Sequence, residues 1–549
     1  MSQMLTKLRA LGLVVVMLAE ALGYRCGAPG LSFLSDFGGH GKVSGIITLR
    51  ADGCPARLLL IPARATAPAP RLTPACEDGR LRQVVDTREL GGGVPYTAVM
   101  VDETGLRSAP VGFTPHNPPV TSVKTLTRGV YVTGGWADTP MDGAYAYIES
   151  GGEIPSWVRG IAVVLAWRQL QPSGPGSLDT SRIRAALSYA ATHAPGRTLP
   201  VVVIIEVGGN ATPLWYVQDP ADGFAEPLMR YLDGPGGASI GFTPWDTLAG
   251  DMFNNATARV AAEFDEHPNL AAIYVGGAGT PRYPEMWYPP IIDCDGRYQG
   301  DANGDGFLDA GDFDWSSDCT PPDADPLRQA AAWRGTFRAM ASQFPRTQLV
   351  GMMDVSRLSD DDPLRSSAAM DAILSEDGIA GNTRLAVGVT NMSPSTFDPG
   401  YLGYTLNDWR KYTSINRYAR QYPAVFRFNE VDPVKFSNLE GSPNAGAYMP
   451  PGRSAPATAG LESGTDYRRW LQDVVGYCGD GPEPGNGPFT VTCDAVLVHR
   501  TNLDPGFYAH GWVFDPCTLR QAQYETWGVG DPEPCANPAD ALAPRAGIL

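Results

Sequence analysis

Apolar and polar positions divide the chain into two regions with different patterns. From about residue 42 to residue 113, short apolar runs such as 57–61 and 96–101 alternate with turns rich in Gly, Pro and Asp, and no helical period is present. This pattern is typical of short strands that bury one face. It predicts a small N-terminal β-sandwich over residues 40–115, with a linker at 114–119.

After about residue 129 the pattern changes to apolar runs that alternate with helices. The helices carry apolar side chains three and four residues apart, for example Phe253, Ala256, Val260 and Phe264, which indicates one buried face. The apolar runs predict eight strands, at 130–134, 160–166, 199–205, 271–275, 348–353, 384–389, 424–428 and 495–499. Alternation of strand and helix predicts βα units and a parallel sheet.

Such a sheet either closes into a barrel or stays open. An open doubly wound sheet would carry a Gly-rich phosphate loop after its first strand, and residues 130–140 contain none. Eight units over about 400 residues suit a barrel with long loops better. The predicted fold class is therefore α/β, with a (β/α)8 TIM barrel over residues 125–549 after the small N-terminal β-sandwich.

The catalytic groups of such barrels lie on the carboxyl-terminal face, where the strands end. The polar and aromatic residues that follow the predicted strands are Trp136, Asp138, Trp167, Arg168, Glu206, Glu285, Asp354, Asn391, Asn429, Glu430, His499 and Arg500. Carboxylates and aromatic rings dominate this set. We expect the active site to be built from it.

Three short motifs in the first half of the barrel resemble one enzyme family. Residues 167–172 (Trp-Arg-Gln-Leu-Gln-Pro), followed by Gly176 and Leu178-Asp179, resemble the second-strand motif of clan A glycoside hydrolases, especially the beta-galactosidase-like branch. Residues 212–215 (Thr-Pro-Leu-Trp) and 243–246 (Thr-Pro-Trp-Asp) fit the same branch. The resemblance covers roughly residues 129–288. It implies a retaining glycosidase with an acid/base Glu after strand four and a nucleophilic Glu after strand seven.

Glu430 matches the nucleophile position, because it directly follows the seventh apolar run. The retaining mechanism needs a second carboxyl group about 5 to 5.5 Å away, to protonate the leaving oxygen. Glu285 is the candidate for this acid/base, although residues 276–284 separate it from the end of strand four. The alternatives are a surface ion pair for Glu430, with Arg427 or Lys435, and a solvent-facing loop position for Glu285.

The resemblance also implies residues that position the sugar, namely Arg168, Trp136 and Asn429. Apolar faces of pyranose rings stack on flat aromatic rings. The aromatic residues at the predicted rim are Trp136, Trp167, Trp215, Trp287 and Trp512. Tryptophan is also a common core residue, so each of these positions has a packing role as its alternative. The predicted sugar-binding residues are Trp136, Trp167, Arg168, Trp215, Trp287 and Asn429.

Residues 301–312 have the ligand spacing of an EF-hand calcium loop. Oxygen-bearing side chains fall at loop positions 1, 3, 5, 9 and 12, a glycine stands at position 6, and the main-chain carbonyl of position 7 is available. The predicted ligands are Asp301, Asn303, Asp305, Phe307, Asp309 and Asp312. Asp312 replaces the usual Glu, which resembles the loops of dockerin modules. The alternative is an acidic surface turn. Because so many ligand positions of the EF-hand loop are matched at once, the sequence predicts structural Ca²⁺ in an insertion at about 290–322.

The N-terminal residues predict export. Lys7 and Arg9 precede the apolar run 11–18 and an Ala-x-Ala site at 19–21, as in a signal peptide over residues 1–21. An uncleaved anchor is the alternative, although the apolar run is shorter than the roughly 20 residues that span a bilayer. The expected localisation is secreted, extracellular or periplasmic, with no membrane insertion after cleavage. A net charge of -17 disfavours nucleic acid as a partner.

Nine cysteines in an exported chain predict disulfides. Neighbours in sequence suggest the pairs Cys54–Cys76, Cys294–Cys319, Cys478–Cys493 and Cys517–Cys535, with Cys26 left over. Eight cysteines allow 105 connectivities, so the pairs rest only on short loops. No pair has the CxxC spacing of a zinc site.

Taken together, the sequence predicts a secreted retaining glycoside hydrolase that acts on a carbohydrate substrate. The leading alternative is an inactive barrel that binds carbohydrate or serves as a calcium-binding surface protein, and the displaced Glu285 is the feature that favours it. A dockerin-like assembly protein fits less well, because dockerins use two such loops and this chain has one.

Overall fold

The fold was analysed in a computed structural model of the 549-residue chain. The structure describes residues 31–77, 79–133, 154, 157–193, 199–207, 211–218, 228–233, 237–242, 247–276, 291–292, 296–299, 313–315, 326–353, 384–389, 424–427, 482–483, 487–488, 493–499 and 523–524. The predicted signal peptide, residues 1–21, lies outside these ranges, as does Cys26.

Eight parallel strands form a closed barrel, with neighbours in the order of the chain. Their bounds are β10 Gly129–Thr133, β11 Gly160–Ala166, β12 Val201–Glu206, β15 Leu270–Tyr274, β19 Gln348–Met353, β20 Leu385–Val389, β21 Ala424–Arg427 and β24 Cys493–His499. The ring closes where β10 pairs with β24, Thr133 standing in register with His499. All eight predicted strands are present, and their ends differ from the prediction by two residues at most.

Helices lie between the early strands, as the prediction requires. They are α3 Trp167–Leu170 and α4 Ser181–Thr192 after β11, α5 Leu214–Gln218 and α6 Thr247–Phe264 after β12, and α7 Pro326–Gln343 after β15. No helix among the described residues is both long and apolar enough to cross a bilayer. The segments that follow β19, β20 and β21 lie largely outside the described residues.

The barrel interior is filled by side chains of alternate strand positions. On β11 the inward set is Ala162, Val164 and Ala166, and on β12 it includes Val202 and Ile204. Successive residues of a strand point to opposite faces, so a residue two positions along points inward as well. Both faces of β11 and β12 are buried, which explains why their sequences are apolar apart from Glu206 at the end of β12.

The N-terminal region forms two sheets. A four-stranded sheet has the order β1-β3-β7-β6, and a five-stranded sheet has the order β2-β9-β8-β4-β5. The strands are β1 Ser32–Phe33, β2 Gly41–Val43, β3 Ile46–Asp52, β4 Arg57–Pro62, β5 Arg71–Leu72, β6 Cys76–Glu77, β7 Arg80–Asp86, β8 Tyr96–Val101 and β9 Val111–Pro115, with a short 3-10 helix at Thr87–Glu89.

Side chains of both N-terminal sheets share one buried cluster, in which Tyr96 stacks on Phe113 with ring centroids 6.0 Å apart. The Cys54–Cys76 disulfide joins the end of β3 to β6, and this predicted pair is confirmed. At least one partner of each other predicted pair lies outside the described residues. The all-β character of residues 40–115 agrees with the structure, and β1 extends it to Ser32.

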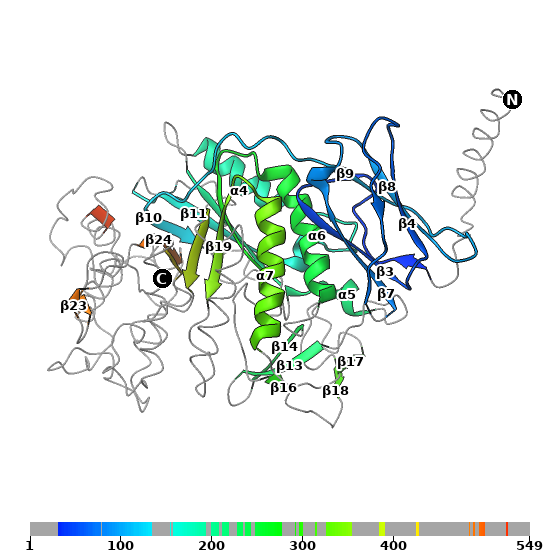
Figure 1. The fold of residues 1–549 in the computed structure, drawn as a ribbon. Coiled ribbons are helices and arrows are strands. Elements are labelled where there is room, and N and C mark those ends of the chain that lie inside the picture. The colour runs from blue at the N-terminus through cyan, green and yellow to red at the C-terminus, as the bar shows by residue number, and fades with distance from the viewer. Residues whose placement is uncertain are drawn as a thin grey trace, which may run out of the picture.

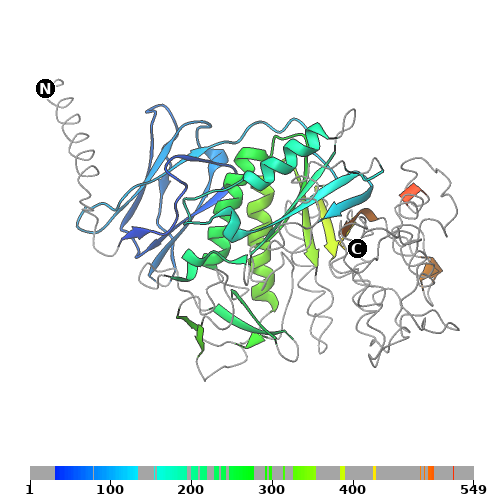
Figure 2. The same cartoon turned by 180° about the vertical axis from the view of Figure 1, so that it is seen from behind.

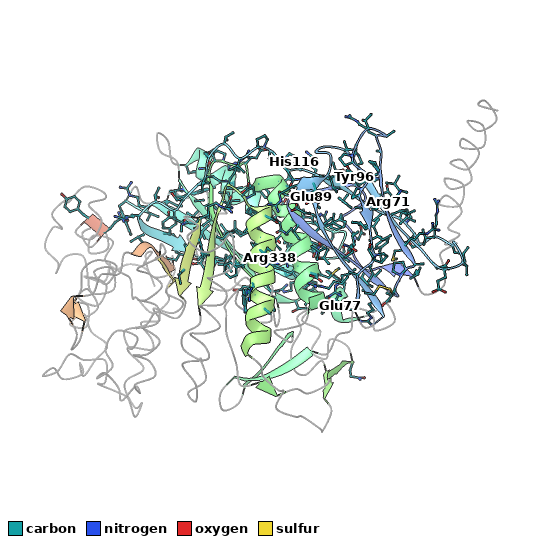
Figure 3. The ribbon with its side chains drawn as sticks, in the orientation of Figure 1. Arg71, Glu77, Glu89, Tyr96, His116 and Arg338 are labelled. Carbon is teal, nitrogen blue, oxygen red and sulfur yellow. A yellow bond between two sulfur atoms is a disulfide. The ribbon has the colours of Figure 1, made fainter. Side chains whose placement is uncertain are left out.

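The N-terminal sheets pack directly on the barrel helices α6 and α7, which stand between the sheets and the barrel strands (Figures 1 and 2). Ala258 of α6 belongs to the buried cluster of the sheets. The Nε2 of Gln343 donates to the carbonyl of Ile46 at 2.8 Å, and Asn255 Oδ1 accepts from the main-chain N–H of Thr48 at 2.9 Å. The two regions are therefore joined by hydrogen bonds across their interface. Figure 3 shows this interface filled with side chains around α6.

A buried ion cluster lies within this interface. Asp251 of α6 accepts from Arg50 Nε at 2.7 Å and from Arg82 Nε at 2.8 Å. The side chains of Asp251 and Arg50 are only 6% and 7% exposed. Burial lowers the pKa of Arg82, but its bonds to Asp251 outweigh this effect and raise the pKa overall. The cluster ties two strands of the N-terminal sheet to one helix of the barrel.

Residues 114–119 are not a free linker. β9 continues to Pro115, and the main-chain N–H of His116 donates to the carbonyl of Val43 at 2.8 Å. Asn117 accepts from the N–H of Gly45 at 2.9 Å and donates to the carbonyl of Thr87 at 3.0 Å. The amide of Asn117 thus satisfies main-chain groups at Gly45 and Thr87, and the predicted linker is bound to the N-terminal sheets.

Lys124 holds the chain against the end of α6. Its Nζ donates to the carbonyls of Asp265 and His267, at 2.7 and 2.9 Å. Burial lowers the pKa of Lys124 from 10.5 to about 8, with Arg346 acting in the same direction and the charges of Asp265 and Glu266 opposing it. The charged form is therefore less favourable in the folded protein than in the unfolded chain.

This shift predicts a pH dependence of stability. Between about pH 8 and pH 10.5 the unfolded chain binds more protons at this site, so the free energy of unfolding should rise with pH. Because Lys124 is only partly buried, we expect a gain of about 1–2 kcal/mol relative to Lys124→Met. Urea unfolding of both proteins at pH 7 and pH 10 measures it. Parallel pH profiles of the two proteins would refute the shift.

Candidate functional site at the carboxyl end of the barrel

Two inserted strand groups lie beyond the carboxyl end of the barrel. They are β13 Leu228–Asp233, β14 Gly237–Phe242 and β16 Ile291–Ile292 in one sheet, and β17 Gly296–Tyr298 with β18 Phe313–Trp315 in a hairpin. β19 points toward this end of the molecule (Figure 1). β13 follows the third barrel strand and β16 follows the fourth, and the two pair directly, Tyr231 with Ile291. The loops after these two strands are therefore joined.

The structure describes three of the predicted site residues. They are Trp167, Arg168 and Trp215, all in segments that follow β11 or β12. Trp136, Glu285, Trp287, Asn429, Glu430 and the six predicted calcium ligands Asp301, Asn303, Asp305, Phe307, Asp309 and Asp312 lie outside the described residues. For these, the structure gives the chain position relative to the barrel strands and nothing further.

Glu206 is a carboxylate at the carboxyl end of the barrel that the resemblance did not select. It is the last residue of β12, stands in register with Ala166 of β11, and has no exposed surface. It lies two and four positions after Ile204 and Val202, both of which face the barrel interior, so it points inward as well. A carboxylate is costly to bury and is rarely kept in a core without a role.

The sequence contained a signal for Glu206. Glu206 directly follows the third apolar run, as Asp354 follows the fifth, and polar groups at this point of a barrel strand are typical of catalysis. Tyr274, the last residue of β15, is almost fully buried in the same interior cluster. The inner face of the barrel mouth thus carries a carboxyl group on β12 and a phenol on β15.

Trp167 is the centre of an aromatic cluster. Its side chain is fully buried and contacts Trp215, Tyr216 and Phe253, with ring centroids 5.9, 5.7 and 5.9 Å apart. Its Nε1 donates to Gln171 Oε1 at 2.7 Å. The predicted role of Trp167 as a sugar platform is therefore not favoured, because a ring without exposed surface has no face for a ligand. It supports Trp215 instead.

Trp215 is half-buried and therefore keeps part of its surface accessible. It lies on α5 after β12, and its Nε1 donates to the main-chain carbonyl of Gln171 at 2.6 Å. This bond links the loop after β12 to the loop after β11. Of the predicted aromatic residues that the structure describes, Trp215 is the one with a surface that a ligand can meet.

Arg168 follows Trp167 in α3 and is also half-buried. The turn that carries it is fixed by Gln169, whose Oε1 accepts from the N–H of Ala166 at 3.0 Å and from Arg182 Nη1 at 3.1 Å. A guanidinium held at a strand end can bind hydroxyl or carboxyl oxygens through several N–H groups. The position is consistent with the predicted sugar-binding role.

The order of the strands in the barrel shows which strand each of the two predicted catalytic residues follows. β15 is the fourth barrel strand and β21 the seventh. Glu430 comes three residues after Arg427, the end of β21, whereas Glu285 comes eleven residues after Tyr274, the end of β15. The segment with Glu285 is bounded by β15 and by β16, which is paired to β13.

The predicted calcium loop lies between the two strands of a hairpin. Tyr298 pairs with Phe313 and Gly296 with Trp315, so the ends of the segment 299–312 are held together. Among the described residues there is no group of three or more His, Cys, Asp or Glu side chains that could hold a metal. The predicted loop is outside that set.

Comparisons with known proteins give fold-level likenesses only. No protein-family model matches the chain, and no curated protein matches it. Among solved structures, endo-glycoceramidase II from Rhodococcus sp. has a TM-score of 0.35 at 12% identity, covering 73% of this chain and 81% of its own. Xylanase 10B from Thermotoga maritima has a TM-score of 0.36 at 10% identity, with coverages of 73% and 95%. At these values the likeness carries no argument about function.

Proposed function

We propose that this protein is a secreted glycoside hydrolase that cleaves O-glycosidic bonds by a retaining mechanism with two glutamates. The observation that carries the proposal is the closed eight-stranded barrel, in which Glu430 follows the seventh strand and Glu285 the fourth. The resemblance to the beta-galactosidase-like branch of clan A implies these two positions for nucleophile and acid/base. Arg168, Trp136, Trp215, Trp287 and Asn429 would bind the carbohydrate.

The chemistry follows from the two roles. Glu430 would attack the anomeric carbon while Glu285 protonates the departing oxygen, and a water activated by Glu285 would then hydrolyse the glycosyl-enzyme. Glu206 adds a third carboxyl group at the barrel mouth, on the strand between those that carry Arg168 and Glu285. It would accept hydrogen bonds from sugar hydroxyls or hold the acid/base in place.

One experiment tests the reaction class. The protein is incubated with 4-nitrophenyl β- and α-glycosides, and the first-formed sugar is followed by proton NMR before mutarotation. A retaining enzyme releases the anomer of the substrate, because two successive displacements restore the configuration. Release of the opposite anomer would exclude a glycosyl-enzyme.

The second candidate function is a barrel without catalytic activity that binds carbohydrate. It is favoured by the ten residues that separate Tyr274 from Glu285, since clan A enzymes usually place the acid directly after strand four. Sugar binding without turnover of any glycoside would support this candidate. Trp215 and Arg168 would bind the sugar in the enzyme and in the non-catalytic protein alike.

We further propose that Ca²⁺ bound at residues 301–312 braces the insertion that follows Glu285. The antiparallel β17–β18 pairing supports this, because it holds the two ends of the loop together. The two positive charges of the ion would offset half of the negative charge of the four Asp ligands and reduce the repulsion among them. The predicted export of the chain suits such a site, as extracellular calcium keeps it filled.

Chelation should therefore lower thermal stability. A ligand present at 100 times its dissociation constant stabilises the folded state by about 2.7 kcal/mol. We expect the melting temperature to fall by several degrees in EDTA, to recover with excess Ca²⁺, and to be insensitive to EDTA in Asp301→Asn, because the first loop position requires Asp. Asp102→Asn, in an exposed turn of the N-terminal sheets, is the control that should keep the full response. An unchanged melting curve in EDTA would exclude a stabilising ion.

A further inference from the structure

The loop between α3 and α4, residues 171–180, is fixed by contacts from three directions. Within the loop, Gln171 Nε2 donates to the carbonyl of Pro175 at 2.6 Å. From α6, Arg259 Nη1 lies within hydrogen-bond distance of the carbonyls of Pro175, Gly176 and Ser177, at 3.3, 2.9 and 3.0 Å. Pro175 thus accepts from both side chains.

The third direction is the N-terminal region. A Cβ on Gly176 would overlap the carboxylate of Asp36, and a Cβ on Gly38 would overlap the carbonyl of Gly176. Gly38 has φ +65, a conformation that glycine adopts without strain. The turn 36–39 is therefore in close contact with the loop. Burial lowers the pKa of Arg259, whereas the negative charge of Asp36 favours its charged form and opposes that lowering.

Gln171 connects this loop to the aromatic rim. Its carbonyl accepts from Trp215 Nε1 at 2.6 Å, and its Oε1 accepts from Trp167 Nε1 at 2.7 Å. A displacement of the loop would move the acceptor of Trp215. The indole ring would then lose one of the contacts that fix its orientation.

We infer that Arg259, Gln171 and the N-terminal turn 36–39 form a relay that positions Trp215 as a sugar-stacking platform. The sugar-binding part rests on the proposed function; the positioning of the ring does not. These residues act through Trp215 and do not themselves contact a ligand. The N-terminal region thereby supports the binding site from the far side of α6, without contacting the ligand.

Fluorine NMR of protein labelled with 5-fluorotryptophan tests the positioning without any sugar. The chain has 12 Trp residues, and Trp215→Phe identifies the signal of Trp215. Arg259→Met and Gln171→Met should both shift or broaden that signal, while Arg57→Met, an exposed arginine of β4, should leave it unchanged. An unchanged Trp215 signal in folded Arg259→Met and Gln171→Met would overturn the relay.

A compensating pair tests the contribution of the N-terminal turn. Gly176→Ala should disturb the Trp215 signal, because the new methyl group meets Asp36, whereas Gly92→Ala meets no atom within 4 Å and serves as control. Combining Gly176→Ala with Asp36→Ala removes the overlap and should restore the signal toward wild type. A Gly176→Ala protein with an unperturbed Trp215 signal would remove the N-terminal turn from the relay.

Kinetics on the best 4-nitrophenyl glycoside test the consequence for binding. Trp215→Ala and Arg259→Met should each raise KM by about tenfold with kcat within about threefold of wild type, since a stacking platform contributes to ground state and transition state alike. In the Trp215→Ala background, Arg259→Met should have no further effect on KM. An undiminished effect in that background would overturn the relay. Absence of all turnover would count against the proposed function alone, and the fluorine spectra would still decide the positioning.

Discussion

Replacing Glu430 by glutamine is expected to lower kcat by a factor on the order of 10⁴ or more, because an amide cannot form the glycosyl-enzyme. The substitution keeps the size and hydrogen-bonding reach of the side chain, so KM and stability should change little. Turnover of 4-nitrophenyl glycosides measures the effect. Glu103→Gln, in an exposed turn of the N-terminal sheets, is the matched control and should retain full activity.

The same assay separates the three carboxyl groups. An activated leaving group needs little protonation, so loss of the acid/base slows mainly the second step, by about 10²–10⁴-fold. Azide, a nucleophile that needs no general base, should then restore turnover. Rescue of Glu285→Gln by azide would support Glu285 as acid/base, whereas rescue of Glu206→Gln would transfer that role to Glu206. Full activity of Glu430→Gln would contradict the nucleophile assignment.

Replacing Asp251 by alanine is expected to have the largest effect on stability. The substitution leaves Arg50, which is 7% exposed, without its carboxylate partner, and also removes a partner of Arg82. Loss of one member of a buried ion pair costs about 3–5 kcal/mol, since the other charge stays buried. Urea unfolding at pH 7 measures the change in the free energy of unfolding.

A surface pair provides the comparison. Arg88 and Asp86 form an ion pair with side-chain exposures of 52% and 26%, and Asp86→Ala should cost about 1 kcal/mol or less. If Asp251→Ala cost no more than Asp86→Ala, the ion cluster would not hold the N-terminal sheets to α6. A separate early unfolding transition in Asp251→Ala would show that the sheets detach first.

Strands such as β11 and β12 were predictable because they are buried on both faces and are almost entirely apolar. Short apolar runs such as 160–166 and 201–205, bounded by predicted helices, favour a central parallel strand. The docking of the N-terminal sheets was not predictable. The apolar positions of α6 indicate one buried face, whereas its opposite face, with Asp251 and Asn255, is also buried, beneath β3. Polar residues on a helix ordinarily indicate solvent, and only the partner sheet changes that meaning.

The candidate site was predictable in outline and less so in detail. The order of the strands and the positions of Glu285 and Glu430 relative to them follow from the alternating pattern. The burial of Trp167 does not, because a tryptophan at a strand end has the same sequence signature in a core and in a cleft. The hydrogen bonds of Gln171 do not follow from the pattern either, because they depend on how two loops distant in sequence approach each other.

The central claim is a covalent glycosyl-enzyme on Glu430. The most direct measurement is to incubate the protein with activated 2-deoxy-2-fluoro glycosides, which slow the breakdown of the intermediate, and to locate the added mass by peptide mass spectrometry. A sugar on the peptide that contains Glu430, absent in Glu430→Gln, is the predicted result. Hydrolysis of a glycoside with a label on another carboxylate, or with release of the inverted anomer, would contradict the account.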